Sequence, residues 1–145
     1  MQEKKIILLA SDCESSRWVY HALKEAAGIE AVILEQPVSK KELAKNRIKK
    51  TGFVPVMGQV LFSALVVPLL KLQSQKRKTY LVSKYGLNSS AINSSKIYRV
   101  NSVNDEGSLK AIQLLQPDII VVNGTRIKKK KILQSTNAIF VNMHV

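Results

Sequence analysis

Residues 4–35, KKIILLASDCESSRWVYHALKEAAGIEAVILE, decide the fold class of this chain. The runs KKIILLA and IEAVILE at the two ends of this stretch are short and apolar, and Pro37 follows the second. Between them, apolar residues from Trp18 to Ala26 recur at helical spacing, and Gly28 stands where a helix C-terminal cap belongs. This strand–helix–strand order predicts a parallel sheet whose faces are covered by helices.

Three more apolar runs continue the pattern towards the C-terminus. KIYRV (96–100), PDIIVVNG (117–124) and NAIFVNMHV (137–145) predict strands because they are short and rich in β-formers. NSVNDEGSLKAIQLLQP (101–117) predicts a turn that leads into a helix, and TRIKKKKILQS (125–135) predicts a short basic helix or turn. The sequence therefore predicts one α/β domain, residues 1–145, with a doubly wound and mostly parallel sheet.

The middle of the chain has a different character. VSKKELAKNRIKK (38–50) predicts a basic helix with Ser39 as its N-cap, and KYGLNSSAINSS (84–95) predicts a loop. Residues 51–70, TGFVPVMGQVLFSALVVPLL, carry no charge over a length that reaches the range of membrane-spanning helices. Two glycines and two prolines interrupt this stretch. It is a membrane span, an interfacial or substrate-facing helix, or a buried helix, and we favour the buried helix.

The composition excludes several classes of protein. The chain has 145 residues, of which 46% are hydrophobic, which suits one globular domain and excludes a disordered segment. A single cysteine, Cys13, excludes an internal disulfide and a zinc site built from cysteines, and we predict no metal site. The N-terminal apolar run lacks the pattern of a secretory signal, so we expect a cytoplasmic protein, with peripheral contact to a membrane as an alternative.

The net charge of +13 is unevenly distributed. Residues 1–50 carry ten basic and seven acidic side chains, whereas residues 51–145 carry thirteen basic and three acidic. A surface with this excess of cations attracts anions, whether nucleic acid, phosphorylated substrates or acidic lipid. Within it, Lys128–Lys131 is a run of four lysines that is interpreted either as a solvated face or as a contact for such anions.

The last predicted strand presents two polar side chains on one face. Because side chains alternate along a strand, Asn142 and His144 lie on the same side as Phe140. They stand at the carboxyl end of the strand, where open α/β sheets bind ligands. An amide that stabilises an oxyanion beside an imidazole that moves a proton suits acyl-type transfer. A polar pair at a strand end is also common as a merely solvated pair.

The C-terminal segment resembles the formyltransferase family. The family pattern is a strand of the PDIIVV type, a G-x-x-I stretch, a short helix and a strand that ends in Asn-x-His. The chain carries these in order at Pro117–Val122, Gly124 with Ile127, Lys128–Gln134 and Asn142-Met143-His144. The family comprises folate-dependent methionyl-tRNA, glycinamide-ribonucleotide and nucleotide-sugar N-formyltransferases. The resemblance implies the Rossmann-like N-terminal domain of such an enzyme.

The resemblance also implies an activity and the roles of individual residues. A formyl group would pass from 10-formyltetrahydrofolate to an amine, in one-carbon metabolism, with Asn142 holding the formyl oxygen and His144 assisting proton transfer. The acceptor would be a nucleotide-linked amino sugar or methionyl-tRNA, and it would face Ser11, Asp12 and Cys13. The folate side would be lined by Val122, Asn123, Gly124, Thr125, Arg126 and Ile127.

One feature of the family pattern has no counterpart in this chain. The family carries a catalytic aspartate after a further strand downstream of Asn-x-His, and the chain has one residue after His144. We therefore expect a formyltransferase domain that is truncated at its C-terminal end, with an exposed edge strand.

A hypothesis from another class is a basic, non-catalytic α/β module. Such a module would bind anionic membrane or RNA through residues 40–78 and 126–131. Cys13, after the first strand, is a further candidate as a nucleophile, although single cysteines are usually small buried residues.

Overall fold

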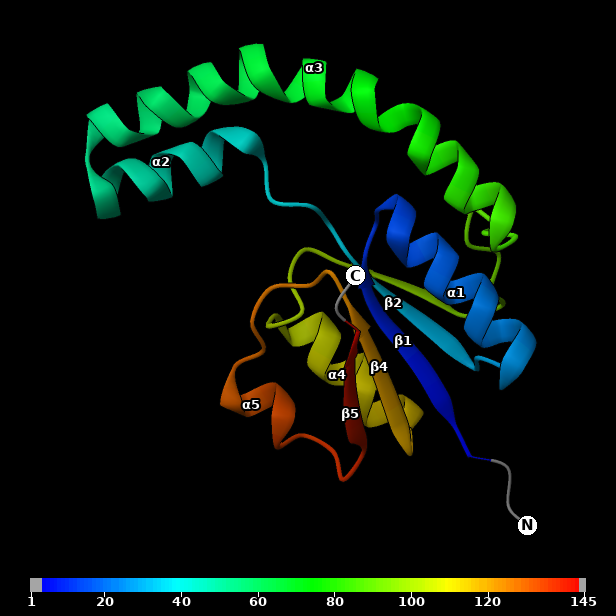
Figure 1. The fold of residues 1–145 in the computed structure, drawn as a ribbon. Coiled ribbons are helices and arrows are strands. Elements are labelled where there is room, and N and C mark those ends of the chain that lie inside the picture. The colour runs from blue at the N-terminus through cyan, green and yellow to red at the C-terminus, as the bar shows by residue number, and fades with distance from the viewer. Residues whose placement is uncertain (1–3, 144–145) are drawn as a thin grey trace. The chain divides into compact units, whose positions relative to one another are not determined.

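The computed structural model of the protein describes residues 4–143 (Figure 1) and divides the chain into two compact units. The first, which we call the sheet domain, comprises residues 4–37 and 88–143 of the described chain. The second, which we call the helical hairpin, comprises residues 38–87. Each unit is described separately below.

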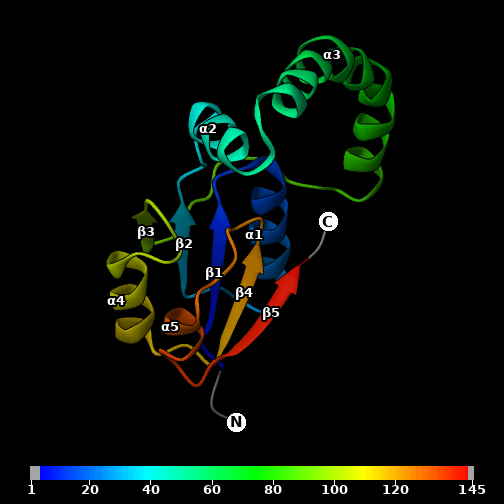
Figure 2. The same ribbon diagram turned by 90° about the vertical axis from the view of Figure 1, so that its left-hand side faces the viewer.

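The sheet domain contains five strands in one sheet (Figure 2). The sheet has the order β3-β2-β1-β4-β5, and every neighbouring pair is parallel. The prediction of an α/β fold with a parallel sheet is therefore confirmed. The strands are β1 (Ile6–Ser11), β2 (Ala31–Glu35), β3 (Ile97–Val100), β4 (Ile119–Asn123) and β5 (Ile139–Met143).

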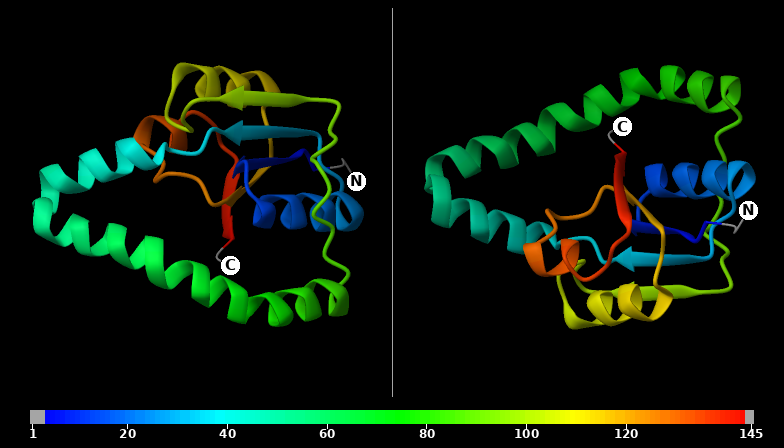
Figure 3. Two further views of the ribbon diagram at one scale, coloured as in Figure 1. Left: turned by 90° about the horizontal axis from the view of Figure 1, so that it is seen from above. Right: turned by 90° about the horizontal axis from the view of Figure 1, so that it is seen from below.

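Helices cover both faces of this sheet. Helix α1 (Glu14–Ala26) packs on one face, where Val19 and Tyr20 join alternate residues of β1 and β2. Helices α4 (Glu106–Leu115) and α5 (Lys130–Leu133) pack on the other, as Figure 3 shows from above and below. Because both faces are covered, β1 is an almost unbroken apolar run, and residues 7–10 have no exposed surface.

The order of the strands creates a switch point between β1 and β4. The chain that leaves β1 enters α1 on one face, whereas the chain that leaves β4 runs to α5 on the other. Connections that leave towards opposite faces open a crevice at the carboxyl ends of the two strands. The sheet thereby places the loops that follow β1 and β4 beside each other, together with the end of β5.

β5 forms one edge of the sheet and pairs with β4 alone among the described strands. Its alternation agrees with the prediction, since Phe140 packs against the core beneath α4 and α5. On the opposite face, Ile139, Val141 and Met143 are exposed. The expected edge strand with exposed apolar surface is therefore present.

The helical hairpin consists of α2 (Lys40–Thr51) and α3 (Phe53–Lys84). The side chain of Ser39 caps α2 by accepting a hydrogen bond of 3.2 Å from the backbone N–H of Glu42, as predicted. Gly52 makes the turn between the helices with a φ of 86°, a conformation that favours glycine. α3 is visibly bent in Figures 1 and 3 and contains Pro68, which has no backbone N–H to donate to the helix.

The favoured interpretation of residues 51–70 as a buried helix is wrong. Residues 53–70 of this stretch form the first half of α3 and slightly more, and Val56 is the one residue of α3 that is buried. α3 is long and apolar enough to cross a membrane by length and composition, and only 6% of its most apolar window is buried. A long run without charge is typical of a helix in an apolar environment. The run alone does not indicate whether that environment is the protein's own core.

Candidate active site

A cavity of about 540 Å³ opens at the carboxyl ends of β4 and β5, beside the N-terminus of α1. Its wall is made by the segment that follows β4, by the end of β5 and by one residue of α1. This position is the crevice that the strand order predicts. The lining residues are Ser15, Asn123, Gly124, Thr125, Arg126, Ile127, Lys128, Leu133, Asn142 and Met143.

Asn142 is one of the two described β5 residues that line this cavity. It lies opposite Val122 in the register of β4 and β5. Its polar side chain is on the same strand face as Phe140, which packs against the core two residues earlier in the strand. The structure therefore brings Asn142 and the predicted 123–127 segment into one site. His144, predicted as its partner, lies outside the described residues.

Gly124 brings the loop after β4 close to the loop after β1. Its φ is 66°, and the hydroxyl of Ser11 donates a hydrogen bond to its carbonyl oxygen. A β-carbon at Gly124 would lie 3.8 Å from the sulfur of Cys13. Two predicted groups of residues, one for the donor and one for the acceptor, therefore meet directly at this glycine.

Asn123 has a structural task in addition to its place in the wall. It is 2% exposed, and its amide Nδ2 donates to the hydroxyl of Ser16 at 2.9 Å and to that of Ser15 at 3.3 Å. These bonds join the end of β4 to the first turn of α1. Val122, also predicted to line the folate side, is 1% exposed and belongs to the hydrophobic core, so its side chain does not line the cavity.

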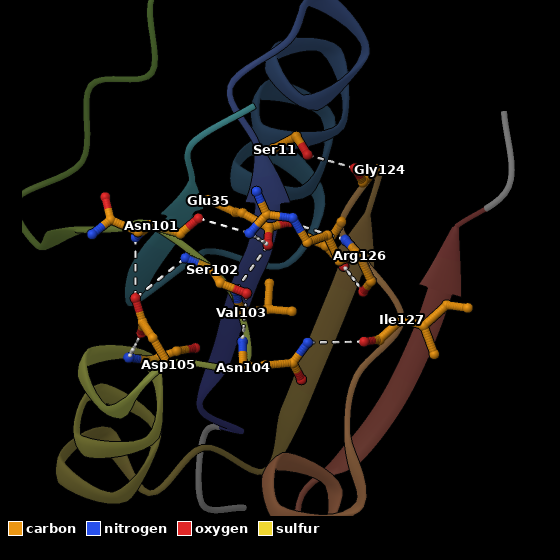
Figure 4. Close-up of polar contacts among 12 residues, drawn as sticks. Ser11, Glu35, Asn101, Ser102, Val103, Asn104, Asp105, Gly124, Arg126 and Ile127 are labelled. Atoms are coloured by element: carbon orange, nitrogen blue, oxygen red, sulfur yellow. Dashed lines mark hydrogen bonds and ion pairs between the residues drawn. The ribbon is translucent and has the colours of Figure 1, made fainter. Parts of the chain in front are cut away.

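Arg126 is held by a buried carboxylate (Figure 4). Glu35, at the carboxyl end of β2, has a side chain that is 2% exposed and lies 3.1 Å from the guanidinium Nη1 of Arg126. The same carboxylate accepts hydrogen bonds of 2.9 Å from the backbone N–H groups of Val103 and Arg126. Arg126 also donates to the carbonyl of Asn101 at 2.8 Å. One carboxylate thus joins the loops that follow β2, β3 and β4.

Asn104 adds a second connection between the same loops. Its amide donates to the carbonyl of Ile127 at 3.0 Å, and its side-chain oxygen accepts from the backbone N–H of Lys129 at 2.7 Å. Asp105 fixes the other end of this loop because it caps α4, accepting from the backbone N–H of Ser108 at 2.8 Å. The wall of the cavity is therefore supported on its outer side by side-chain hydrogen bonds.

Lys128 places a cation in the cavity wall. Burial lowers the pKa of its ammonium group, and the negative charge of Glu35 opposes this effect in part. A partly desolvated cation beside Arg126 makes this part of the cavity suited to an anionic group.

The residues after β1 divide between two environments. Partial burial raises the pKa of the Cys13 thiol, but hydrogen bonds from the side chains and backbone of Ser15 and Ser16 outweigh burial and lower the pKa below its ordinary value. The thiol lies 3.3 Å from the hydroxyl of Ser15 and 3.2 Å from that of Ser16. Asp12 instead lies 3.6 Å from both Arg17 and Arg99, and it is not part of the cavity wall.

Three contributors to the site were not predicted from the sequence as site residues. Leu133 and Met143 line the cavity, and Glu35 supports it. An acidic residue at the end of an otherwise apolar strand is the signal that marks Glu35. Among residues 4–143, no three His, Cys, Asp or Glu side chains lie together in a way that would hold a metal ion.

Comparison with known proteins provides no family assignment. No model of a known protein family matches the sequence, and no curated protein matches it.

Proposed function

We propose that this protein transfers a formyl group from 10-formyltetrahydrofolate to an amine. The observation that carries the proposal is that Asn142 and the segment from Asn123 to Ile127 line a single cavity at the switch point of the sheet. These are the residues to which the resemblance assigns the formyl oxygen and the folate. Their meeting in space supports the proposal because the two segments could have packed elsewhere in the fold.

The chemistry needs a donor aimed at an oxygen that becomes negative. The acceptor amine attacks the formyl carbon, and the carbonyl oxygen takes up the electron pair. The carbon–nitrogen bond to the folate then breaks, and the folate nitrogen receives the proton that the amine loses. An amide such as that of Asn142 stabilises the oxyanion in a partly enclosed site. The proposal assigns the proton transfer to His144.

The charge of the cavity wall suits the proposed ligands. Arg126 and Lys128 place two cations in the wall, and both folate and a nucleotide-linked substrate carry anionic groups. Arg126 is held in position by Glu35, so little side-chain freedom is lost on binding. We propose an amine acceptor that bears phosphate, with a nucleotide-linked amino sugar before methionyl-tRNA. Ser11 and Cys13 would face this acceptor.

Binding of the donor tests the proposal directly. Calorimetric titration of the full chain with a non-transferable 10-formyltetrahydrofolate analogue should show saturable binding. Arg126→Ala should weaken that binding. Asn142→Ala should leave that binding little changed. Asn137→Ala is its matched control, because Asn137 is an exposed amide that precedes β5 at the opposite end of the strand. Absence of binding to the full chain, or equal binding by the wild type and Arg126→Ala, would overturn the proposal.

A further inference from the structure

The helical hairpin carries most of the net charge of the protein. Residues 38–87 contain eleven lysines and arginines and a single acidic residue, Glu42, so they contribute +10 of the total +13. Six of the basic residues are in α2, which has twelve residues. This unit is therefore a strongly cationic body attached to a sheet domain of modest charge.

The same unit exposes a stripe of large apolar side chains. Val54, Leu61, Leu65, Leu69 and Leu72 recur at spacings of three, four and seven residues along α3, so they share one side of the helix. Each is at least 54% exposed, and Leu65 is 65% exposed. An isolated leucine on a surface needs no explanation, but an aligned row of five marks an interaction surface.

α2 packs on the other side of α3. Arg47 donates a hydrogen bond of 2.7 Å to the side-chain oxygen of Gln59, and a hollow between the two helices is lined by Gln59, Ser63 and Val56. Gln59 and Ser63 are one turn apart and lie opposite Leu61 and Leu65 on the helical wheel. The hairpin is therefore two-sided, with the basic α2 on one side and the apolar stripe on the other.

The topology of the sheet restricts how the hairpin meets a membrane. β2 and β3 are hydrogen-bonded neighbours, and the hairpin is the chain segment inserted between them. Both ends of the hairpin therefore return to the same folded body. One crossing of a bilayer by α3 would place these ends on opposite sides, and α2 is too highly charged to make a second crossing.

The flanking charges give the orientation. Lys49 and Lys50 precede the uncharged stretch 51–70 and Lys71 follows it. If α3 does not cross, these cations all lie on one side of the membrane, and both ends of the stretch stay at the level of the headgroups. The apolar half of α3, about 27 Å long at 1.5 Å per residue, would then lie in the plane of the interface with its apolar stripe in the acyl layer.

We propose that the helical hairpin binds the surface of an anionic lipid bilayer. α3 lies in the plane of one leaflet without crossing it, and the cations of α2 and of residues 71–84 contact the acidic headgroups. Lipid is favoured over RNA because RNA offers no apolar layer for the exposed leucine row. This inference does not depend on the proposed formyl transfer, because the hairpin contains none of the residues of the cavity.

Vesicle flotation of the full chain tests this proposal. The protein should float with vesicles that contain phosphatidylserine, and it should bind pure phosphatidylcholine vesicles less. Leu65→Glu should reduce binding to the anionic vesicles at least about tenfold, because it places a charge in the acyl layer. Leu114→Glu is the matched control, since Leu114 is a 74% exposed leucine of the sheet domain. It should bind as the wild type does.

The contribution of charge has a matched pair of variants as well. Lys49→Gln with Lys50→Gln should reduce binding about 30-fold, because each basic residue near the surface contributes about 1 kcal/mol. The same change at the exposed Lys129 and Lys130 of the sheet domain should have little effect. The proposal is overturned if Leu65→Glu binds vesicles as well as the wild type. It is also overturned if single-stranded RNA displaces the wild type and Leu65→Glu from vesicles equally.

Labelling from outside sealed vesicles separates an in-plane helix from a crossing. In a Cys13→Ser background, Thr51→Cys and Ser83→Cys place single thiols at exposed positions before and near the end of α3. A membrane-impermeant thiol reagent should label both variants equally. Labelling of one position alone would show that α3 crosses the bilayer, and this result would overturn the in-plane arrangement.

Discussion

The guanidinium group of Arg126 lies 3.1 Å from the carboxylate of Glu35, and the Glu35 side chain is 2% exposed. The two residues are 91 positions apart in the chain. The backbone N–H of Arg126 donates to the second oxygen of the same carboxylate, so the loop after β4 is attached to β2 at two points. This pairing sets the position of the cavity wall.

Glu35→Gln should destabilise the sheet domain by about 3 kcal/mol. The amide that replaces the carboxylate removes the charged partner of Arg126, whose side chain is 34% exposed. It also turns an N–H group towards a backbone donor, either that of Val103 or that of Arg126. Urea unfolding followed by circular dichroism measures this loss. Glu106→Gln is the control, because Glu106 pairs with Lys131 at 3.0 Å on the surface. It should lose less than about 1 kcal/mol. Equal losses in the two variants would contradict the structural role of Glu35.

In the proposed reaction, Asn142→Ala should reduce the rate of formyl transfer by about 10²–10³-fold while binding of the folate donor changes little. The expected loss is that of one oxyanion donor, which acts mainly in the transition state. Steady-state kinetics with a phosphate-bearing amine acceptor separate kcat from KM. Asn137→Ala should keep the wild-type kcat. A loss confined to KM would show that Asn142 holds the ground state and does not stabilise the oxyanion.

The Cys13 thiol should ionise at a lower pH than an ordinary cysteine. Because hydrogen bonds from Ser15 and Ser16 lower its pKa, Ser15→Ala should shift the pH midpoint of alkylation upward. The rate of reaction with iodoacetamide between pH 6 and pH 10 measures the midpoint. Cys13 is the sole cysteine of the chain, so the signal has one source. Ser95→Ala should leave the midpoint unchanged, and an equal shift in both variants would rule out a local hydrogen bond as its cause.

Asp118 should contribute to stability at neutral pH and lose this contribution in acid. Its carboxylate accepts a hydrogen bond of 2.8 Å from the backbone N–H of Lys5, which lowers its pKa, and the charge of Lys4 lowers it further. The unfolded chain therefore takes up this proton at a higher pH than the folded chain. The stability gained above the ordinary pKa of aspartate, about 4, is lost as the pH falls through the lower folded value.

Asp118→Asn tests this sign. The variant should unfold at a lower urea concentration than the wild type at pH 7, and the difference should vanish as the pH is lowered below about 4. The effect should be smaller than that of Glu35→Gln, because the Asp118 side chain is 42% exposed. A difference that is the same at pH 7 and at pH 2 would assign the effect to packing instead.

Gly124→Ala should destabilise the sheet domain by about 1 kcal/mol. The position has room for a methyl group, since the nearest side-chain atom would be 3.8 Å away, but its φ of 66° is unfavourable for alanine. Gly107→Ala, in the first turn of α4, has no such φ and should be close to neutral. Urea midpoints compare the two variants. A neutral Gly124→Ala would show that this loop relaxes freely.

The central strands β1, β2 and β4 could be predicted because each is a mostly apolar run that the sheet buries on both faces. The run IILLA corresponds to β1, and the PDIIVVNG segment contains β4. α3 could not be predicted in full, because prolines at positions 55 and 68 look like interruptions in the sequence. Pro55 lies in the first turn, where no intrahelical hydrogen bond is lost, and the helix continues through Pro68 with a bend.

Part of the candidate site could be predicted from short sequence motifs, whereas the rest depends on contacts between residues far apart in the chain. The Asn142 side and the 123–127 segment follow from short motifs that lie close together in the sequence. Glu35 could not be found from such motifs, because its partners Val103 and Arg126 lie 68 and 91 positions away. The position of Val122 in the core also follows from the sheet register, which the sequence does not contain explicitly.

The carboxylate that joins the loops after β2, β3 and β4 has a consequence for when the cavity is completed during synthesis. Glu35 leaves the ribosome long before Val103 and Arg126 do. The loops that follow β3 and β4 therefore have no anchor until the sheet has assembled around Glu35. A nascent chain that ends before residue 126 therefore has no pocket wall. If the proposed donor binds in this cavity, capture of a 10-formyltetrahydrofolate analogue by nascent chains of increasing length should begin as one abrupt event, after the fifth strand, which carries Asn142, has emerged and docked.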